Sequence, residues 1–185
     1  MRLLLRVERL LKSILPAKVT NIIRGLLGWD KTEYINVNIK ELLIHHEKTN
    51  KRKLIGIIIK LLAVEDYYGK NNMGFDLYKK YLVAHSSLNK ALECIDKFKK
   101  LIDSFEKNAY DMTSEIHCDK NMHLLDGDHR TALCMYHHIG VVPCRVFINK
   151  KGYAYKGDWY KDNGFTVGEM DIIWAKYNEI KNAAT

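Results

Sequence analysis

The sequence predicts an α+β fold, a small mixed sheet flanked by helices, from two kinds of periodicity. Apolar residues recur at i, i+3 and i+4 along residues 87–107, and residues 51–69 are apolar around most of a helical circumference, so both predict helices that pack on a core. Residues 34–39 alternate apolar and polar side chains, which is typical of a half-buried strand. Three further strands are expected at residues 115–118, 123–125 and 142–148.

A short helix is expected between the last two of these strands. It should begin in the turn at residues 126–130 and run to about His138, with Gly140 as its C-terminal stop. The segment from 115 to 148 therefore predicts two strands, a tight turn, a helix and a strand.

The composition fits one globular domain. The chain has 185 residues, of which 47% are hydrophobic and 28% charged, so it can bury a core of ordinary size. The net charge of +8 favours anionic partners, namely nucleic acid, anionic lipid or phosphorylated ligands, and does not choose among them. The four cysteines lack CxxC spacing and no secretory signal peptide is evident, which predicts reduced thiols in a cytoplasmic protein.

Both ends of the chain carry distinct patterns. Residues 1–28 are basic and amphipathic, with Pro16 dividing two short helices. Such a segment can lie on an anionic membrane surface, and it can equally pack on the domain or on a second subunit. Residues 151–185 begin with an aromatic loop and continue, after a capping box at Thr166 and Glu169, as a helix that we expect to pack on the domain.

Other constellations favour structure over function. Trp159, Tyr160 and Lys161 could stack on a base or a sugar, but a small apolar core under the tail helix is the favoured interpretation. Lysines at 79–80 and 97–100 could form a nucleic-acid patch, although such runs more often mark solvated helix faces. The eight histidines include no ligand pair of zinc spacing, so a structural zinc site is disfavoured.

Residues 126–130, with the sequence DGDHR and called the acidic turn below, concentrate the most chemistry. A helix that starts here presents free N–H groups and a positive dipole end, which bind phosphate. Arg130 adds a planar fork for phosphate oxygens, and His129 adds a donor that can switch charge. Asp126 and Asp128 could hold Mg²⁺, accept a proton from a hydroxyl, or cap the helix. The alternative is an ordinary Asp-Gly-Asp turn with Asp128 as the N-cap.

Three runs together resemble the ParB/sulfiredoxin superfamily: EIHCD at 115–119, LLDGDHRTA at 124–132 and GVVPCRV at 140–146. The resemblance covers residues 88–148, although Glu115-Ile116 stands where the family has Pro-Ile. It implies a domain at 31–150 with residues 34–39 as the first strand and residues 49–86 as a helical insertion. Residues 1–30 and 151–185 would be an N-terminal helical part and a C-terminal tail.

Members of this superfamily have different functions, and their motifs distinguish which of these functions the sequence fits. Sulfiredoxins carry a nucleophilic cysteine where this sequence has Asp128, so sulfinic acid repair is not expected. Chromosome-partition members carry a downstream DNA-binding domain, whereas one helix-sized segment follows residue 165 here. The branch with DGxHR includes free-serine kinases, and this likeness implies that nucleotide phosphates are cradled by Gly127, His129, Arg130 and Thr131. It also implies that Asp126 or Asp128 orients the acceptor or a metal, with Mg²⁺ on Asp126 and ATP or ADP as the nucleotide.

The resemblance does not place the catalytic glutamate, which lies early in the kinases. The candidates here are Glu41, Glu47 and Glu65, and Glu65 is favoured because, with Asp66, it ends an apolar helix where a site could open. The runs GFDLYKKY at 74–81 and KFKKLI at 97–102 also resemble small ParB-like proteins that accompany bacterial surface-polysaccharide enzymes.

The sequence therefore predicts a kinase-like, nucleotide-dependent phosphotransferase that acts on a small or glycan-linked hydroxyl. We expect it in the cytoplasm, with residues 1–28 available to bind the inner membrane face. The alternative is a non-catalytic nucleotide- or nucleic-acid-binding regulator. Nucleic acid is the less favoured partner, and the oligomeric state is left open.

Overall fold

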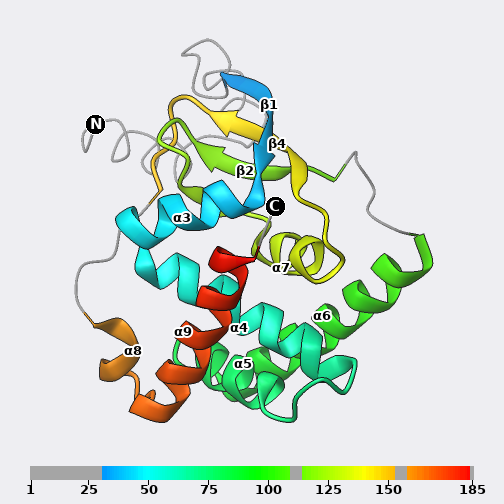
Figure 1. Cartoon of the computed structure of the whole chain (residues 1–185), viewed down its shortest axis with the longest axis vertical. Coiled ribbons are helices and arrows are strands. Elements are labelled where there is room, and N and C mark those ends of the chain that lie inside the picture. Colours follow the sequence, from blue (N-terminus) through cyan, green and yellow to red (C-terminus); the bar gives the residue numbers. More distant parts are fainter. Residues whose placement is uncertain (1–30, 109–113, 153–157, 184–185) are drawn as a thin grey trace, which may run out of the picture.

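The computed structural model describes residues 31–108, 114–152 and 158–183. Within these residues the fold is α+β, as predicted, with seven helices and one four-stranded mixed sheet. Figure 1 shows the sheet at one end of the molecule and the helices gathered beneath it. The amphipathic segment 1–28 and the aromatic residues Tyr153 and Tyr155 lie outside the described residues, and so do the predictions that rest on them.

The sheet has the strand order β1-β4-β2-β3. Its strands are β1 (Thr32–Asn38), β2 (Ile116–Asp119), β3 (Leu124–Asp126) and β4 (Val141–Phe147). β4 is antiparallel to β1 and parallel to β2, and β2 is antiparallel to β3. Pro143 is tolerated in the inner strand β4 because pairing with β2 begins one residue later, at Cys144.

The helices follow the predicted positions closely. They are α3 (Ile39–Thr49), α4 (Lys51–Tyr67), α5 (Gly74–Val83), α6 (Leu88–Asn108), α7 (Asp128–Tyr136), α8 (Trp159–Asp162) and α9 (Val167–Asn182). The capping box is confirmed, because the Thr166 hydroxyl accepts from the Glu169 N–H and the Glu169 carboxylate accepts from the Thr166 N–H. The prediction that Gly140 ends α7 is wrong. The chain already reverses at His138, which has a left-handed φ of 57°.

Helix α4 forms the centre of the helical layer. Every residue from Leu54 to Val64 is buried, including Lys60. α4 contacts α3, α5, α7 and α9, and Figure 1 shows it running through the middle of the layer. Residues 49–86, expected as an insertion, therefore supply the helix around which the others pack.

The tail packs on the domain through α9. Ile173 and Tyr177 of α9 are buried, and the helix contacts α3 and α4. In the short helix α8, Tyr160 is buried and its hydroxyl donates to the carbonyl of Arg52 at 2.7 Å. Trp159 lies 4.1 Å beneath the Arg52 guanidinium. Both rings also lie against Tyr81 of α5, so Trp159 and Tyr160 belong to an aromatic cluster that joins α8 to α5 and to Arg52 of α4.

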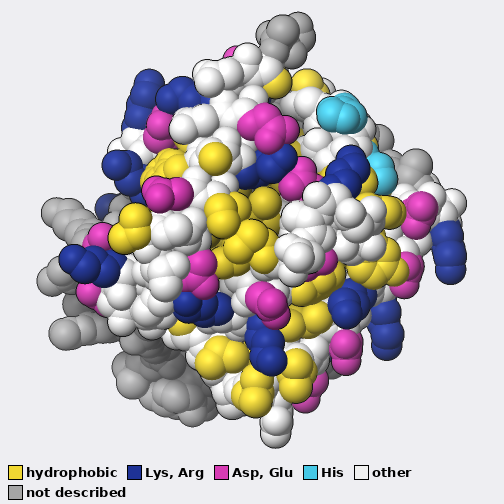
Figure 2. Space-filling model, turned by 60° about the horizontal axis from the view of Figure 1, so that its bottom comes forward, with side chains coloured by type: hydrophobic (Ala, Val, Ile, Leu, Met, Phe, Trp, Pro, Cys, Tyr) yellow, Lys and Arg dark blue, Asp and Glu magenta, His cyan; other side chains and the backbone are white. Residues whose placement is uncertain are grey.

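The end of the molecule away from the sheet has a mixed surface. Figure 2 shows lysines and arginines interspersed with acidic and apolar side chains on this face. The charges there do not form a field of one sign, which favours solvated helix faces over a nucleic-acid patch. Among the described helices, none is long and apolar enough to cross a membrane.

Candidate functional site

Gly127 divides the acidic turn into two sides. Its φ is 103°, and a Cβ at this position would lie 2.8 Å from Cγ2 of Ile116. Only glycine fits both conditions, so the chain can leave β3 and enter α7 at once. Gly127 itself is the N-cap of α7, and no side chain of the described residues caps this helix end. The alternative interpretation, with Asp128 as the N-cap, is therefore wrong, because Asp128 is the first helical residue.

Asp128 faces the helical layer, where α4 supplies two cations. Its carboxylate lies 3.0 Å from Nζ of Lys53 and 3.5 Å from Nζ of Lys60. Burial alone would raise the pKa of Asp128, but the two lysines outweigh it and leave the pKa below its usual value. Burial lowers the pKa of Lys60, and Asp128 opposes that shift. Asp128 is thus engaged in a largely buried ion-pair cluster.

His129 and Thr131 also point into the protein. His129 Nε2 is 2.6 Å from the hydroxyl of Tyr78, and its ring centroid lies 4.4 Å from that of Phe98. Burial lowers the pKa of His129 to about 4, so the ring is neutral near pH 7. The Thr131 hydroxyl is buried and donates to the carbonyl of Gly127 at 3.0 Å. The side chains of His129 and Thr131, two of the four residues expected to cradle phosphate, therefore hold α7 in place inside the protein.

Asp126 and Arg130 lie on the other side of the turn, among charged residues of the sheet. Asp126 Oδ2 is 3.8 Å from both Arg130 and His117. The Arg130 guanidinium donates to the carbonyl of Glu115, whose carboxylate pairs with Arg145 at 2.6 Å and with His117 at 3.4 Å. The Asp126 side chain is 66% exposed, so this carboxylate is open to a ligand.

Strand register explains why this charged cluster was missed. Asp126 pairs with His117, His117 with Arg145, and Arg145 with Tyr34, which places one residue of each strand in a single row. The chain order does not reveal which residues become neighbours across three strand pairs. A signal was present, because His117 and Arg145 each stand between buried residues in strands of alternating burial.

The three candidate glutamates lie in different places. Glu65 pairs with Lys176 of α9 at 2.9 Å, and Glu47 pairs with Lys181 at 2.8 Å. Glu41 instead lines a pocket of about 330 Å³ between β1, α3 and the β2–β3 turn. The two pairs with α9 hold Glu65 and Glu47 in place as links between α9 and the rest of the helical layer.

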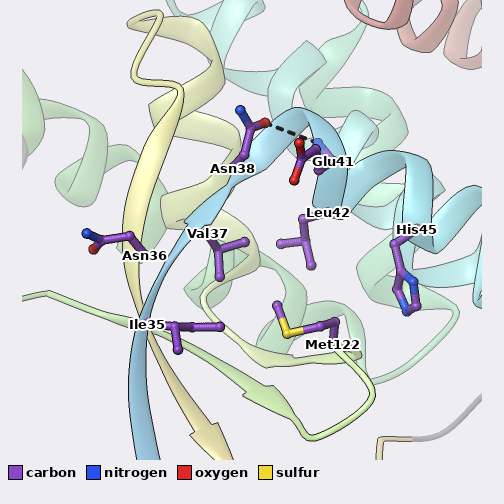
Figure 3. Close-up of a pocket in the computed structure, with 8 residues that line it drawn as sticks. All are labelled: Ile35, Asn36, Val37, Asn38, Glu41, Leu42, His45 and Met122. Atoms are coloured by element: carbon purple, nitrogen blue, oxygen red, sulfur yellow. Dashed lines mark hydrogen bonds between the residues drawn. The ribbon is translucent and has the colours of Figure 1, made fainter.

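Figure 3 shows this pocket in detail. Ile35 and Val37 of β1 face Leu42 of α3 and Met122 of the β2–β3 turn across it, and His45 stands at the side away from β1. Such a mixture of apolar walls and few polar groups is typical of small-molecule sites, and the volume is at the lower end of their range.

Metal binding finds little support in protein ligands alone. Among the described residues, no group of three or more histidines, cysteines or acidic residues is arranged to hold a metal ion. Cys118, Cys134 and Cys144 are buried, and burial raises the pKa of Cys134 to about 12, so this thiol is protonated near pH 7. Mg²⁺ that arrives with a nucleotide needs only one or two protein carboxylates, and Asp126 is the exposed one at the turn.

We compared the chain with family models, with curated proteins and with solved structures, and found no match in any of the three comparisons.

Proposed function

We propose that this chain is a nucleotide-dependent phosphotransferase that phosphorylates a hydroxyl group of a small or glycan-linked compound. The observation that carries the proposal is the start of α7. The helix begins without a side-chain cap from the described residues, with Lys53 beside it on the helical side and Arg130 on the sheet side. Free first-turn amides, a helix dipole and flanking cations together favour the phosphates of a nucleotide.

The resemblance to the ParB/sulfiredoxin superfamily supports the same assignment. The segment 115–148 folds in the order that the resemblance implies, two strands, a glycine turn, a helix and a strand in a mixed sheet. The likeness of DGDHR to the free-serine kinases favours phosphoryl transfer. It is an analogy at the level of fold and motif, so the chemistry must be tested at the residues themselves.

The residues divide the work as follows. Arg130 holds phosphate oxygens through its guanidinium fork, and the first-turn amides of Asp128 and His129 donate to further phosphate oxygens. Lys53 lies within reach of Asp128 and contributes positive charge next to these amides. Mg²⁺, when bound, would neutralise phosphate charge, and Asp126 would be its protein ligand. His129 and Thr131 act by fixing α7, since their side chains are used inside the protein.

The experiment is turnover with ATP or ADP, Mg²⁺ and a panel of alcohols and sugars, followed by phosphorus NMR. Arg130→Ala should lower kcat/KM at least about 100-fold, because a charge-assisted contact to the transferred group is lost, while Arg130→Lys should fall between. Lys176→Ala, which removes the partner of Glu65 in α9, is the matched control and should leave turnover close to that of the wild type. A wild-type protein that consumes no nucleotide with any acceptor but binds DNA in a salt-sensitive manner would instead support a non-catalytic regulator.

The cellular setting is a separate part of the proposal. Residues 1–28 are basic and amphipathic in sequence, which favours attachment to an anionic membrane surface near glycan substrates. Vesicles with and without anionic lipid test it, and equal binding to both would remove the membrane from the proposal.

A further inference from the structure

The sheet row, formed by Asp126 of β3, His117 of β2, Arg145 of β4 and Tyr34 of β1, crosses all four strands. Side-chain contacts follow the same order as the register. Asp126 Oδ2 lies 3.8 Å from Nδ1 of His117, and the Arg145 guanidinium lies 5.0 Å from the centroid of the Tyr34 ring. Glu115 joins the two halves, because its Oε1 is 3.4 Å from Nε2 of His117 and 2.6 Å from Nε of Arg145. The row is therefore one continuous run of contacts.

The sheet row faces away from the helical layer. Successive side chains of a strand point to opposite faces of the sheet. The neighbours of His117 and Arg145 in their strands belong to the buried core: Ile116, Cys118, Cys144 and Val146. Figure 3 shows the same alternation in β1, where Ile35 points into the pocket and Asn36 points away from it. Tyr34, two residues before Asn36, therefore shares the outer face with His117 and Arg145.

One end of the sheet row is the phosphate site of the proposed function. Arg130 lies 3.8 Å from Oδ2 of Asp126, and its guanidinium also donates to the carbonyl of Glu115. These contacts place the guanidinium at the β3 end of the row, where the Asp126 side chain is 66% exposed. A nucleotide that is held there by its phosphates can extend along the row toward β1.

The other end of the sheet row carries an open aromatic ring. Tyr34 is 63% exposed and is the most exposed aromatic residue of the described part of the chain. It lies on an edge strand, because no described strand pairs with the other side of β1. Nucleobases stack on exposed aromatic rings, and a neighbouring guanidinium such as that of Arg145 adds a cation–π contribution.

The dimensions and the chemistry of the sheet row fit one nucleotide. Adjacent strands are about 4.8 Å apart, so the three steps from β3 to β1 span roughly 14 Å. This is the length scale of an extended nucleoside triphosphate. Between the two ends lie the Glu115 carboxylate and the His117 imidazole, which are groups that hydrogen-bond to ribose hydroxyls.

We propose that the nucleotide lies across the strands along the sheet row, with its phosphates at Arg130 and its base stacked on Tyr34. The proposal rests on the phosphotransferase function and adds the nucleoside half of the site. Stacking recognises the flat face that every base has, so the site accepts nucleoside phosphates as a class and distinguishes them from inorganic polyphosphate. The terminal phosphate then lies at the acidic turn, at the end of the row away from β1.

The first test is calorimetry with two ligands, ATP and inorganic tripolyphosphate, each with Mg²⁺. Tyr34→Leu should weaken ATP binding at least about 5-fold, because base stacking is lost, and should leave tripolyphosphate binding unchanged. Arg130→Ala should weaken the binding of both ligands. Ile35→Ala, on the same strand but on the opposite face, is the matched control and should change neither affinity.

A second measurement identifies the ring itself. In wild-type protein labelled at its tyrosines, H2 and H8 of the adenine of ATP should give NOEs to tyrosine ring protons. Tyr34→Phe keeps a stacking ring, so it should bind ATP with nearly the wild-type affinity while the NOEs to labelled tyrosine disappear. A merely structural role of Tyr34 would not produce this pattern.

Failure of the base site and failure of the proposed function give different results. If Tyr34→Leu binds ATP as tightly as the wild type while Arg130→Ala loses it, the base lies elsewhere and the phosphate site stands. If Tyr34→Leu loses tripolyphosphate as well, Tyr34 supports the fold and the base site is wrong. If the wild type binds neither ligand, the proposed function fails and the base site fails with it. A single-stranded oligonucleotide that binds through Tyr34 more tightly than ATP would overturn the mononucleotide as the occupant.

Discussion

Two turns flank the short strand β3, and in each of them the contacts in the structure differ from those that the sequence led us to expect. The acidic turn after β3 is rich in reactive side chains, yet Asp128, His129 and Thr131 are engaged within the protein. The β2–β3 turn before it, residues 119–123, has an ordinary turn composition, yet its buried Asp119 carboxylate contacts Nδ1 of His123 at 3.0 Å and its Met122 lines a pocket. The comparison teaches that residue type indicates chemistry, while availability depends on which partners the fold brings in from elsewhere in the chain.

The largest expected effect separates the two sides of the acidic turn itself. Asp128→Ala should lower the free energy of unfolding by about 3 kcal/mol or more, because it leaves Lys60 buried without its carboxylate partner. Asp126→Ala removes a carboxylate that is 66% exposed and should change stability by no more than about 0.5 kcal/mol. Urea unfolding of both variants measures the difference. Equal losses would show that Gly127 does not divide the turn into a structural and an open side.

A pH dependence follows from the neutral histidines near the two turns. The pKa of His46 is lowered to about 3 and that of His129 to about 4, against 6.5 for an unperturbed imidazole. Between pH 6.5 and 4 these histidines are therefore protonated in the unfolded chain but not in the folded chain. The free energy of unfolding is highest above pH 6.5 and decreases as the pH falls through this range.

The measurement is the free energy of unfolding from urea titrations across this pH range. Each histidine contributes a slope of up to about 1.4 kcal/mol per pH unit. His129→Gln removes one of the two titrating groups, so the slope should fall by up to about 1.4 kcal/mol per pH unit. The variant also loses the contact with Tyr78 and therefore has a lower free energy of unfolding at every pH. A slope unchanged by this substitution would contradict the buried, neutral state of His129.

The sequence predicted the fold class and most elements, because periodicity and capping are local signals. The long helix at 87–107, the capping box at Thr166 and the strands around residues 116–126 needed no partner to be recognised. Contacts between side chains far apart in the chain could not be predicted from the sequence. Nothing local indicated that Lys53 and Lys60 would meet Asp128 across 68 or more residues.

The same reason accounts for the sites that were missed. Asp119 and His123 are four residues apart, between two predicted strands, and no local pattern indicates that the turn there brings their side chains into contact. The presence of His45 and His46 next to this pair depends on α3 packing against the β2–β3 turn. The turn at Gly127 could be predicted as a bend, but not the direction in which each of its side chains points.

Glycine substitutions compare the backbone requirements of the two turns. Gly127→Ala should cost about 2 kcal/mol, because its φ is 103° and the new methyl group would meet Ile116. Gly152→Ala places a Cβ 2.6 Å from that of His123 and should displace the imidazole, at a smaller cost because a loop can shift. Gly140→Ala, with open space around it, is the control and should be near neutral. Thermal melting gives the stabilities, and the ¹⁵N signal of His123 should move only in Gly152→Ala.

The smallest effect concerns two residues with a left-handed backbone, one of them in the β2–β3 turn. His138 is exposed and has a φ of 57°, so His138→Gly should raise the free energy of unfolding by a few tenths to about 1 kcal/mol, because relief of strain exceeds the added chain entropy. Met122 has a similar φ of 60° but packs against the core and forms a pocket wall. Met122→Gly relieves the same strain and loses that packing, so its net effect should be near zero or destabilising. If both substitutions stabilise the protein equally, then the Met122 side chain adds nothing to the fold and its strained position is explained by the turn alone.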